Sequence, residues 1–476
     1  MKQQKLIANI IRPNKNISFP IGTIFTVKKY FEKLGFSNIF SRYKKRGRDI
    51  SSLIEALVSY KLTENFSITK ASNWINRKEV LNEFSLKSFH EKTLFRVLGI
   101  IGKNKDEIIA GIQDNLFNEY DFDHTDTNID WTSIILWGEM CKLAKHGYSK
   151  DHRPDKKQIN LGISEIAEPV NIPIGITVDQ GNIPDVKHFE KTYNQIKNKL
   201  KKDSRIVFDK GASSEYNINL ILSDQMKYLT AKKLNKSDDK RIIEFDKDKY
   251  ECVDSEDGIY GKKFVKPSKI DYFYFSEKLE KTQLESRRRK SRKMLEEAKE
   301  IQKSLDNNKA LPKRFQIKNK LVDVKYEYQT KLKELDEEKA LELLEKEIIT
   351  GREGFFCFFS NENLTLSEAL KVYRKKDSVE KIINSLKNEI EIKPLRVWTD
   401  ESIYGAIVIG FLAQLFISLM RYDNEKLKNI STKFLKNSLM NLTVTIEILE
   451  NKTKRQIYAN FDSINEVILS KWQEIT

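Results

Sequence analysis

The chain has 476 residues, with 85 lysines and arginines against 69 aspartates and glutamates, which gives a formal net charge of +16. This excess favours a polyanionic partner, either nucleic acid or an acidic membrane surface, and the 39% of hydrophobic residues exclude a chain that is disordered throughout. At roughly 150 residues per domain, the length predicts about three domains. The three cysteines form no Cys-x-x-Cys pair, so neither a disulfide framework nor a cysteine-ligated zinc site is expected. A cytoplasmic location is expected instead, because the cytoplasm keeps cysteines reduced.

Residues 1–120 are predicted to form a helical N-terminal DNA-binding domain. Apolar residues recur at helical spacing in SSLIEALVSYKL, in ITKASNWINRKEVL and in TLFRVLGIIGKNKDEIIAGIQDNLF. Ser67 is expected to cap the second of these segments. Two short helices in a basic context are typical of a helix-turn-helix reader of DNA, although an ordinary helical bundle fits the same pattern. The first residues contain no apolar segment of signal-peptide length, so secretion is not expected.

Residues 121–235 carry strand signals and are predicted to form the first part of a catalytic α/β domain. The runs IDWTSIILW, KQINLGISEI and VNIPIGITVDQGN predict three consecutive strands. A helical stretch over 185–202 then precedes the strand SRIVFDKG, and a second helix precedes MKYLTAKKL. The order β-β-β-α-β-α-β predicts a mixed sheet flanked by helices, because a crossover helix implies a parallel neighbouring strand.

Residues 236–352 are predicted to be a charged, mainly helical insertion, with Pro312 at the turn of a helical hairpin. A basic run in this part of the chain comprises Arg287, Arg288, Arg289, Lys290, Arg292 and Lys293. Residues 353–425 are predicted to complete the catalytic domain with an aromatic strand, REGFFCFFSN, and a helix over 366–390. Residues 426–476 form a C-terminal region to which the sequence assigns no role.

The segment 402–420 has no charged residue and reaches the length of about 18 apolar residues that is typical of a membrane span. Gln414, Ser402 and Ser418 interrupt it, two glycines weaken it, and the sequence contains no second candidate span. A buried core helix is therefore the favoured interpretation, and no membrane partner is expected.

Two aspartates are placed where acids of an open α/β sheet commonly bind metal ions, at the ends of strands. Asp130 lies in the first predicted strand, and Asp209 ends the fourth, just before a glycine. If these strands are neighbours, the two acids face one another and repel unless a cation lies between them, which favours Mg²⁺ or Mn²⁺. A single aspartate at a strand end is also a common turn-former.

The predicted helix over 366–390 presents a second group of polar side chains beside its apolar stripe. These side chains are Tyr373, Lys376, Glu380 and Lys387. A carboxylate flanked by two ammonium groups and a phenol suits a metal ligand next to groups that hold DNA phosphates. The solvated face of an ordinary amphipathic helix gives the same periodicity.

Together, IDWTSIILW, GYSKDHRPDKKQINLG, GNIPD, RIVFDKG and the row Tyr-x2-Lys-x3-Glu-x6-Lys within YRKKDSVEKIINSLK resemble the DDE transposases of prokaryotic insertion sequences, in the branch with a Tyr-Arg-Glu-Lys signature. The resemblance covers roughly residues 128–420 and implies an RNase H-like catalytic domain. It implies that Asp130, Asp209 and Glu380 form the catalytic, metal-binding triad. Asp123 and Asp126 lie near the first acid, and either is the ligand if the strand register differs.

The same resemblance implies what the protein binds and does. Two Mg²⁺ or Mn²⁺ ions are expected, with Tyr373, Lys376 and Lys387 at the DNA phosphates; Lys376 replaces the signature arginine and loses its bidentate contact. Arg287, Arg288 and Arg289 are expected to bind DNA as well. The implied function is cleavage of element ends and strand transfer into target double-stranded DNA, by a dimer on DNA, in the cytoplasm with the nucleoid. An RNase H-like nuclease without strand transfer and a catalytically decayed DNA-binding protein are the alternatives.

Overall fold

The chain divides into two compact units in the computed structural model. The first unit comprises Met1–Tyr228 and Arg374–Thr476, and the second comprises Leu229–Tyr373. The structure describes residues 16–44, 47, 49–63, 67–307, 322–323, 329–330, 335–448 and 454–472. Pro312, the expected turn of the helical hairpin, lies outside these residues.

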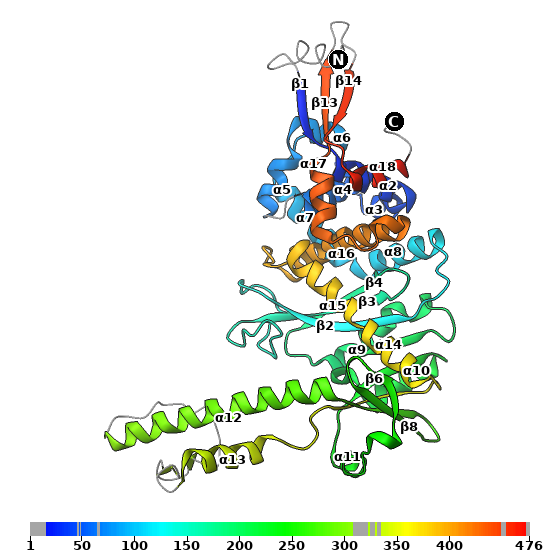
Figure 1. The fold of residues 1–476 in the computed structure, drawn as a ribbon. Helices are drawn as coiled ribbons and strands as arrows, with labels where there is room; N and C mark the ends of the chain where they lie inside the picture. Colours follow the sequence, from blue (N-terminus) through cyan, green and yellow to red (C-terminus); the bar gives the residue numbers. More distant parts are fainter. Residues whose placement is uncertain are drawn as a thin grey trace, which may run out of the picture. The chain divides into compact units, whose positions relative to one another are not determined.

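Helices fill the N-terminal part of the first unit, as the apolar spacing predicts. They are α2 (Gly22–Lys33), α3 (Phe36–Ser41), α4 (Ile50–Thr63), α5 (Ile68–Ile75), α6 (Lys78–Glu83), α7 (Lys92–Lys103) and α8 (Lys105–Glu119) (Figure 1). The side chain of Ser67 accepts a hydrogen bond from the Lys70 amide and caps α5, as expected.

One strand departs from the all-helical prediction for residues 1–120. β1 (Asn16–Pro20) pairs antiparallel with β13 (Thr443–Ile448), which in turn pairs with β14 (Lys454–Ala459). The helices α17 (Thr432–Asn441) and α18 (Ser463–Ser470) belong to the same C-terminal region. Because the partner of β1 lies at the other end of the chain, no local periodicity in residues 1–120 could indicate this pairing.

The long apolar helix α16 (Asp400–Asp423) packs inside the first unit. By length and composition it could cross a membrane, yet 89% of its most apolar window is buried within the protein. It packs against α7, α4 and β4 (Ile172–Gln180). Gly405 approaches α7 so closely that a Cβ atom there would lie 2.1 Å from the carbonyl oxygen of Leu98. The glycine that weakens a membrane span thus permits close helix packing, as suits a core helix.

The sheet of the first unit has the predicted mixed topology. β2 (Thr127–Ile135), β3 (Gln158–Ile166) and β4 form an antiparallel meander, and β5 (Arg205–Phe208) pairs parallel with β2. The crossover contains α9 (Asp185–Ile196), and α10 (Glu215–Ser223) follows β5. The order β4-β3-β2-β5 is that of the RNase H-like sheet expected from the sequence.

The two faces of this sheet are covered by different helices. Trp131 points to one face, where its indole N–H donates to the hydroxyl of Thr192 in α9 at 3.2 Å. Asn128 points to the opposite face, where its amide donates to Ser378 of α15 (Asp377–Asn384) at 2.9 Å. Side chains alternate along a strand, so Asp130 shares the α15 face with Asn128.

The second unit contains strands where the sequence predicts a mainly helical insertion. β7 (Glu251–Asp254), β8 (Ile259–Val265) and β9 (Ile270–Ser276) join β12 (Phe355–Ser360) in the order β12-β9-β8-β7, and β12 also pairs with β6 (Lys227–Lys232). The strands escape detection because lysines interrupt the alternation in IYGKKFV, while the aromatic run IDYFYFS stands alone among charged residues.

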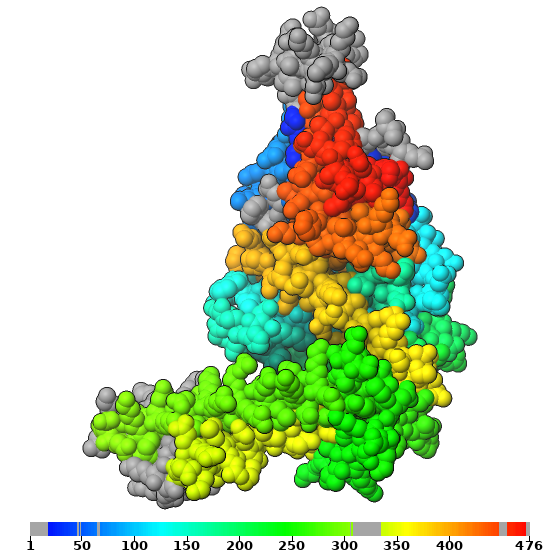
Figure 2. Space-filling view, in the orientation of Figure 1, coloured from blue at the N-terminus to red at the C-terminus, as the bar shows by residue number. Residues whose placement is uncertain are grey.

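The helical hairpin predicted for the insertion is present beside these strands. Its two helices are α12 (Glu277–Asp306) and α13 (Glu337–Ile348), which lie along one another in Figures 1 and 2. A small apolar core holds them together, formed by Met294, Leu295, Ala298, Ala340 and Leu344. The short pair β10 (Val322–Asp323) and β11 (Gln329–Thr330) completes the described part of this segment.

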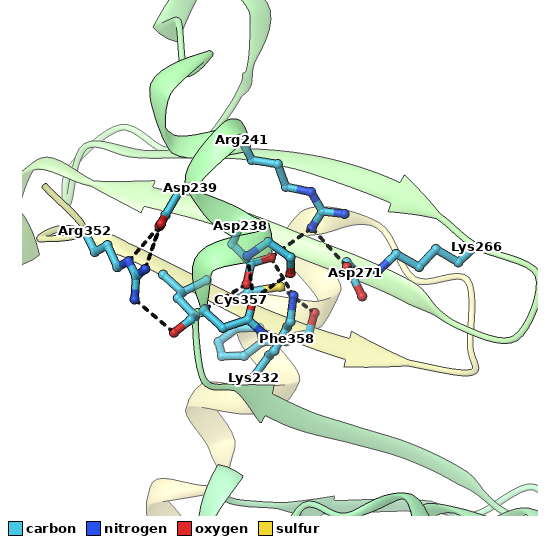
Figure 3. Close-up of polar contacts among 12 residues, drawn as sticks. Lys232, Asp238, Asp239, Arg241, Lys266, Asp271, Arg352, Cys357 and Phe358 are labelled. Carbon is cyan, nitrogen blue, oxygen red and sulfur yellow. Dashed lines mark hydrogen bonds and ion pairs between the residues drawn. The ribbon is translucent and has the colours of Figure 1, made fainter. Parts of the chain in front are cut away.

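A buried network of charges holds β6, α11 (Asp239–Ile243) and β9 together in the second unit (Figure 3). Asp271 is fully buried, and its carboxylate contacts Lys266 at 2.6 Å and Arg241 at 3.0 Å. Asp238, which is 1% exposed, pairs with Lys232 at 2.5 Å. Because each buried carboxylate has a cation within contact distance, the charges compensate one another inside the unit.

Candidate active site

The two predicted aspartates are brought together by the pairing of β2 with β5. The last paired residues of these parallel strands are Ile129 and Phe208. Asp130 and Asp209 each follow directly, and Asp209 keeps an extended backbone, with φ −81° and ψ 160°. Neighbouring strands lie about 4.8 Å apart, so the continued register places the two acids side by side at the end of β5. The condition on which the sequence argument depends, that the first and fourth predicted strands are neighbours, is therefore met.

Asp209 also has the turn-forming role that a strand-end aspartate commonly plays. Its carboxylate accepts a hydrogen bond from the Lys210 amide at 2.8 Å and so caps the short helical turn Lys210–Ala212. One carboxylate oxygen is used in this bond. Capping fixes the orientation of the side chain, and an oriented carboxylate is a better ligand than a freely rotating one.

Asp130 is a mostly buried acid whose nearest cation is a lysine. Its side chain is 15% exposed, and one carboxylate oxygen lies 3.9 Å from the ammonium nitrogen of Lys376. Burial raises the pKa of Asp130, while Lys376 and Lys150 act to lower it. A carboxylate in this environment gains from any further cation, since burial penalises its charged form.

Lys376 links the first aspartate to the predicted glutamate. Its ammonium lies 3.5 Å from a carboxylate oxygen of Glu380, and its side chain is 7% exposed, whereas that of Glu380 is 61% exposed. The helix predicted over 366–390 is divided here: α14 (Leu366–Lys375) ends just before Lys376, and α15 begins just after it. Lys376 itself keeps a helical backbone, with φ −57° and ψ −23°, and its ammonium lies within contact distance of the carboxylates of both Asp130 and Glu380.

Lys387, predicted to contact DNA phosphate, is placed against an acid instead. It lies in the π-helical turn Ser385–Glu389, is 8% exposed, and pairs with Asp151 at 3.2 Å. Burial lowers the pKa of Lys387, and Asp151 acts to raise it. A phosphate contact through Lys387 would have to compete with this ion pair.

The other predicted DNA-binding residues belong to the second unit. The ring of Tyr373 stacks on Phe358, with ring centroids 4.1 Å apart. Arg287, Arg288 and Arg289 are exposed along α12, although Arg287 also lies 3.7 Å from Glu353. Exposed guanidinium groups can bind phosphates, although three consecutive helix residues point in different directions around α12; their DNA contact stays a prediction.

Of the two alternatives for the first acid, Asp126 is engaged elsewhere and Asp123 precedes the strand. Asp126 accepts from the Arg205 amide at 2.8 Å and forms an ion pair with its guanidinium at 2.9 Å. Asp123 lies four residues before the start of β2 and is exposed. Asp130 is therefore the acid that the register places beside Asp209.

Two further polar side chains next to the site were not singled out from the sequence. Lys150 donates to the carbonyl oxygen of Trp131, the residue that follows Asp130 in the chain, at 2.5 Å. It also donates to the carboxylate of Asp185 at 3.1 Å. Glu165 on β3 is fully buried and bonded to Asn128 and Ser378. A lone glutamate within the apolar run QINLGISEI is the signal that could have indicated Glu165.

The candidate active site supplies some of the oxygen ligands that a hard divalent cation requires. Asp130 and Asp209 supply carboxylate oxygens from adjacent strand ends, which are the ligands that Mg²⁺ and Mn²⁺ prefer. Among the residues that the structure describes, no group of three histidine, cysteine, aspartate or glutamate side chains lies close enough to hold a metal ion. The expected triad is thus seen as a pair of aspartates, with Glu380 connected to Asp130 through Lys376.

Comparison with known proteins gives a distant structural likeness. No protein-family model matches the chain, and no curated protein matches it in sequence. Among solved structures, the piggyBac transposase in a synaptic complex with hairpin DNA is similar, with a TM-score of 0.43 and 11% sequence identity, over 98% of this chain and 84% of that chain. None of these findings tests the predicted branch with the Tyr-Arg-Glu-Lys signature, which stays a prediction.

Proposed function

We propose that the protein is a DDE-type DNA transposase that binds the ends of an insertion sequence, cleaves them and joins them to target DNA. The observation that carries the proposal is the register of β2 and β5, which places Asp130 beside Asp209 at the end of β5. Two acids held side by side at strand ends repel one another, and a sequence keeps such an arrangement at low cost only where a cation compensates it.

Asp130 and Asp209 would hold divalent metal, with Glu380 as the third ligand once Lys376 releases it. Two bound Mg²⁺ or Mn²⁺ ions would supply activation of a water or 3′-hydroxyl and stabilisation of the leaving oxygen of a phosphodiester. Lys376, buried between two acids, would place a positive charge next to the attacked phosphate. Lys150 would keep the strand around Asp130 in place through its bond to the Trp131 carbonyl.

The proposed partner is double-stranded DNA, both the element ends and the target. The net charge of +16 favours a polyphosphate partner. Part of this positive charge is exposed on α12, at Arg287, Arg288 and Arg289. Joining requires two ends at once, so we propose a dimer on DNA, acting in the cytoplasm at the nucleoid. The proposed phosphate contacts are Tyr373, Lys376 and Lys387. Lys387 would leave its ion pair with Asp151 to bind a phosphate.

One observation favours a second candidate, a catalytically decayed DNA-binding protein. The ammonium of Lys376 contacts both Asp130 and Glu380, and so already offers these acids one positive charge. A lysine that permanently occupied this position would compete with a metal ion. The RNase H-like nuclease without strand transfer shares every residue of the site and differs from the transposase only in its products.

The test uses the purified full chain, Mg²⁺ and a duplex that carries the DNA flanking its gene. The proposal expects cleavage that frees 3′ ends and, with added target, joined products. Asp130→Asn, Asp209→Asn and Glu380→Gln should each abolish both reactions, while the control Asp179→Asn, at the far edge of the same sheet, should not. Cleavage without joining identifies the nuclease. DNA binding without cleavage by the unaltered chain identifies the decayed protein.

A further inference from the structure

Glu165 lies where three elements of the first unit meet. It is paired with Asn128 across β3 and β2, and the Asn128 amide donates to Glu165 Oε1 at 3.1 Å. The hydroxyl of Ser378, in the first turn of α15, donates to the same oxygen. The Asn128 amide also donates to the Ser378 hydroxyl at 2.9 Å. These bonds form a closed triangle that joins both strands to the helix.

The carboxyl group of Glu165 is buried without a cation in contact. The residue is 0% exposed, and Oε2 has no hydrogen-bond partner among the described residues. Burial raises the pKa of Glu165 to about 8; Ser378, Asn128 and Lys376 act to lower it, and Asp130 acts to raise it. The raised pKa favours the protonated form of the group at neutral pH, and Oε1 is the oxygen that accepts both hydrogen bonds.

The triangle controls the residues of the candidate active site through their spacing along the chain. Ser378 lies two residues after Lys376 and two before Glu380, so a bond to Ser378 fixes the turn that carries both. Asn128 lies two residues before Asp130 on the same face of β2. A shift of α15 along the sheet would change the distances of 3.9 Å and 3.5 Å that Lys376 makes to the two acids.

We propose that Glu165, through its bonds to Ser378 and Asn128, is a positioning residue that fixes α15 on the sheet and so places Lys376 and Glu380 relative to Asp130. We call the hydrogen-bonded group of Glu165, Asn128 and Ser378 the clamp. The catalytic consequence of the clamp rests on the proposed function, but the clamp itself is a property of the fold. A buried protonated carboxyl suits this role, because it accepts from both partners without requiring a cation that would compete at the neighbouring acids.

Hydrogen exchange tests the clamp without any reaction. In Glu165→Ala, the amides of 377–384 should exchange at least about 10-fold faster than in the unaltered chain, because α15 loses its anchor. Glu165→Gln, which keeps the acceptor oxygen and the shape, should leave them unchanged. Ser164→Ala is the matched control, since Ser164 is the buried neighbour on β3 whose hydroxyl has no hydrogen-bond partner among the described residues. Unchanged exchange in Glu165→Ala would overturn the proposal.

Cleavage kinetics then test the consequence for the site. Glu165→Ala should lower kcat by about 10- to 100-fold with little change of KM for DNA, the size of effect typical of residues that orient ligands. Glu165→Gln should restore kcat. If Glu165→Ala does not fold, Ser378→Ala decides, because it removes only the helix side of the clamp. An inactive unaltered chain with the predicted exchange pattern refutes the proposed function and keeps the clamp. An active Glu165→Ala variant with unaltered kcat refutes the proposed positioning of Lys376 and Glu380.

Discussion

Each unit of the molecule contains a fully buried carboxyl group, Glu165 in the first and Asp271 in the second, and the two groups differ in whether a cation contacts them. In the second unit, Asp271 has Lys266 and Arg241 within 3.0 Å; burial would raise its pKa, but bonds from these two cations lower it below the usual value (Figure 3). In the first unit, Glu165 has only neutral partners, and burial raises its pKa to about 8. Paired charges thus build a scaffold in the second unit, whereas the fully buried acid next to the candidate active site has only neutral partners in contact.

The difference teaches that burial by itself does not mark a functional acid. Asp271 and Glu165 are both 0% exposed. What separates them is the presence of a cation in contact, which decides whether the group is ionised at neutral pH. Asp130 lies between these cases, because it is mostly buried and its nearest cation is 3.9 Å away.

The largest expected effect is the pH dependence that Glu165 gives to stability. Its pKa is about 8 in the folded chain and near 4.5 when unfolded. The protonated group therefore contributes stability that is fully present below pH 4.5 and is lost as pH rises through 8, by at most about 5 kcal/mol. Urea unfolding followed from pH 5 to 9 should show this decline, and Glu165→Gln should remove it. Equal slopes for the two chains would refute the neutral carboxyl.

A second large effect is expected from Asp271→Ala in the second unit. The substitution leaves Lys266 and Arg241 facing one another without their carboxylate, which should cost about 3 to 5 kcal/mol of unfolding free energy. Glu244→Ala, which removes an exposed partner of Lys240, is the control and should leave the unfolding midpoint unchanged. If both variants unfolded alike, the buried network would not be the scaffold of this unit.

A third, smaller effect is expected from substitution of Lys376, the cation nearest to the mostly buried Asp130. Lys376→Met removes the nearest cation of Asp130 and should raise the pKa of that carboxyl further, with a loss of about 1 to 3 kcal/mol at neutral pH. Carbon-13 NMR titration of the aspartate carboxyls measures the pKa directly. Lys375→Met, one residue earlier and exposed at the surface, is the control. An unshifted Asp130 would show that Lys376 does not act on it.

The smallest effect is expected from Ser378→Ala. This variant removes the hydrogen bond that Ser378 donates to Glu165 and the bond that it accepts from Asn128, and it leaves the bond from Asn128 to Glu165. The expected loss of unfolding free energy is about 1 to 2 kcal/mol. Denaturant unfolding of Ser378→Ala, Glu165→Ala and the double variant gives the coupling between the two side chains. Additive losses would mean that the two groups do not interact.

Much of the sheet could be predicted from local patterns. Alternating β-branched residues predicted the strands that carry Asp130 and Asp209, and the short crossover permitted these strands to be neighbours, as the structure has them. The pairing of β1 with β13 could not be predicted, since the partner lies at the opposite end of the chain. The strand β8 was missed because lysines interrupt its alternation.

The details of the site depend on tertiary contacts that periodicity does not encode. The apolar stripe through Val372 and Val379 predicts one continuous helix, yet the helix is divided at Lys376. The side chain of Lys376 is 7% exposed and its ammonium lies 3.9 Å from Asp130, a burial that the periodicity does not indicate. Glu165 looked like one polar residue in an apolar strand, and only its partners Asn128 and Ser378 reveal what it contacts.

The central claim is that Asp130 and Asp209 together hold a divalent cation, and electron paramagnetic resonance of Mn²⁺ titrated into the full chain with duplex DNA measures this directly. The account predicts that the unaltered chain takes up Mn²⁺ and that Asp130→Asn and Asp209→Asn each lose this uptake, while Asp179→Asn retains it. Equal uptake by all four chains, or none by the unaltered chain, would contradict the claim.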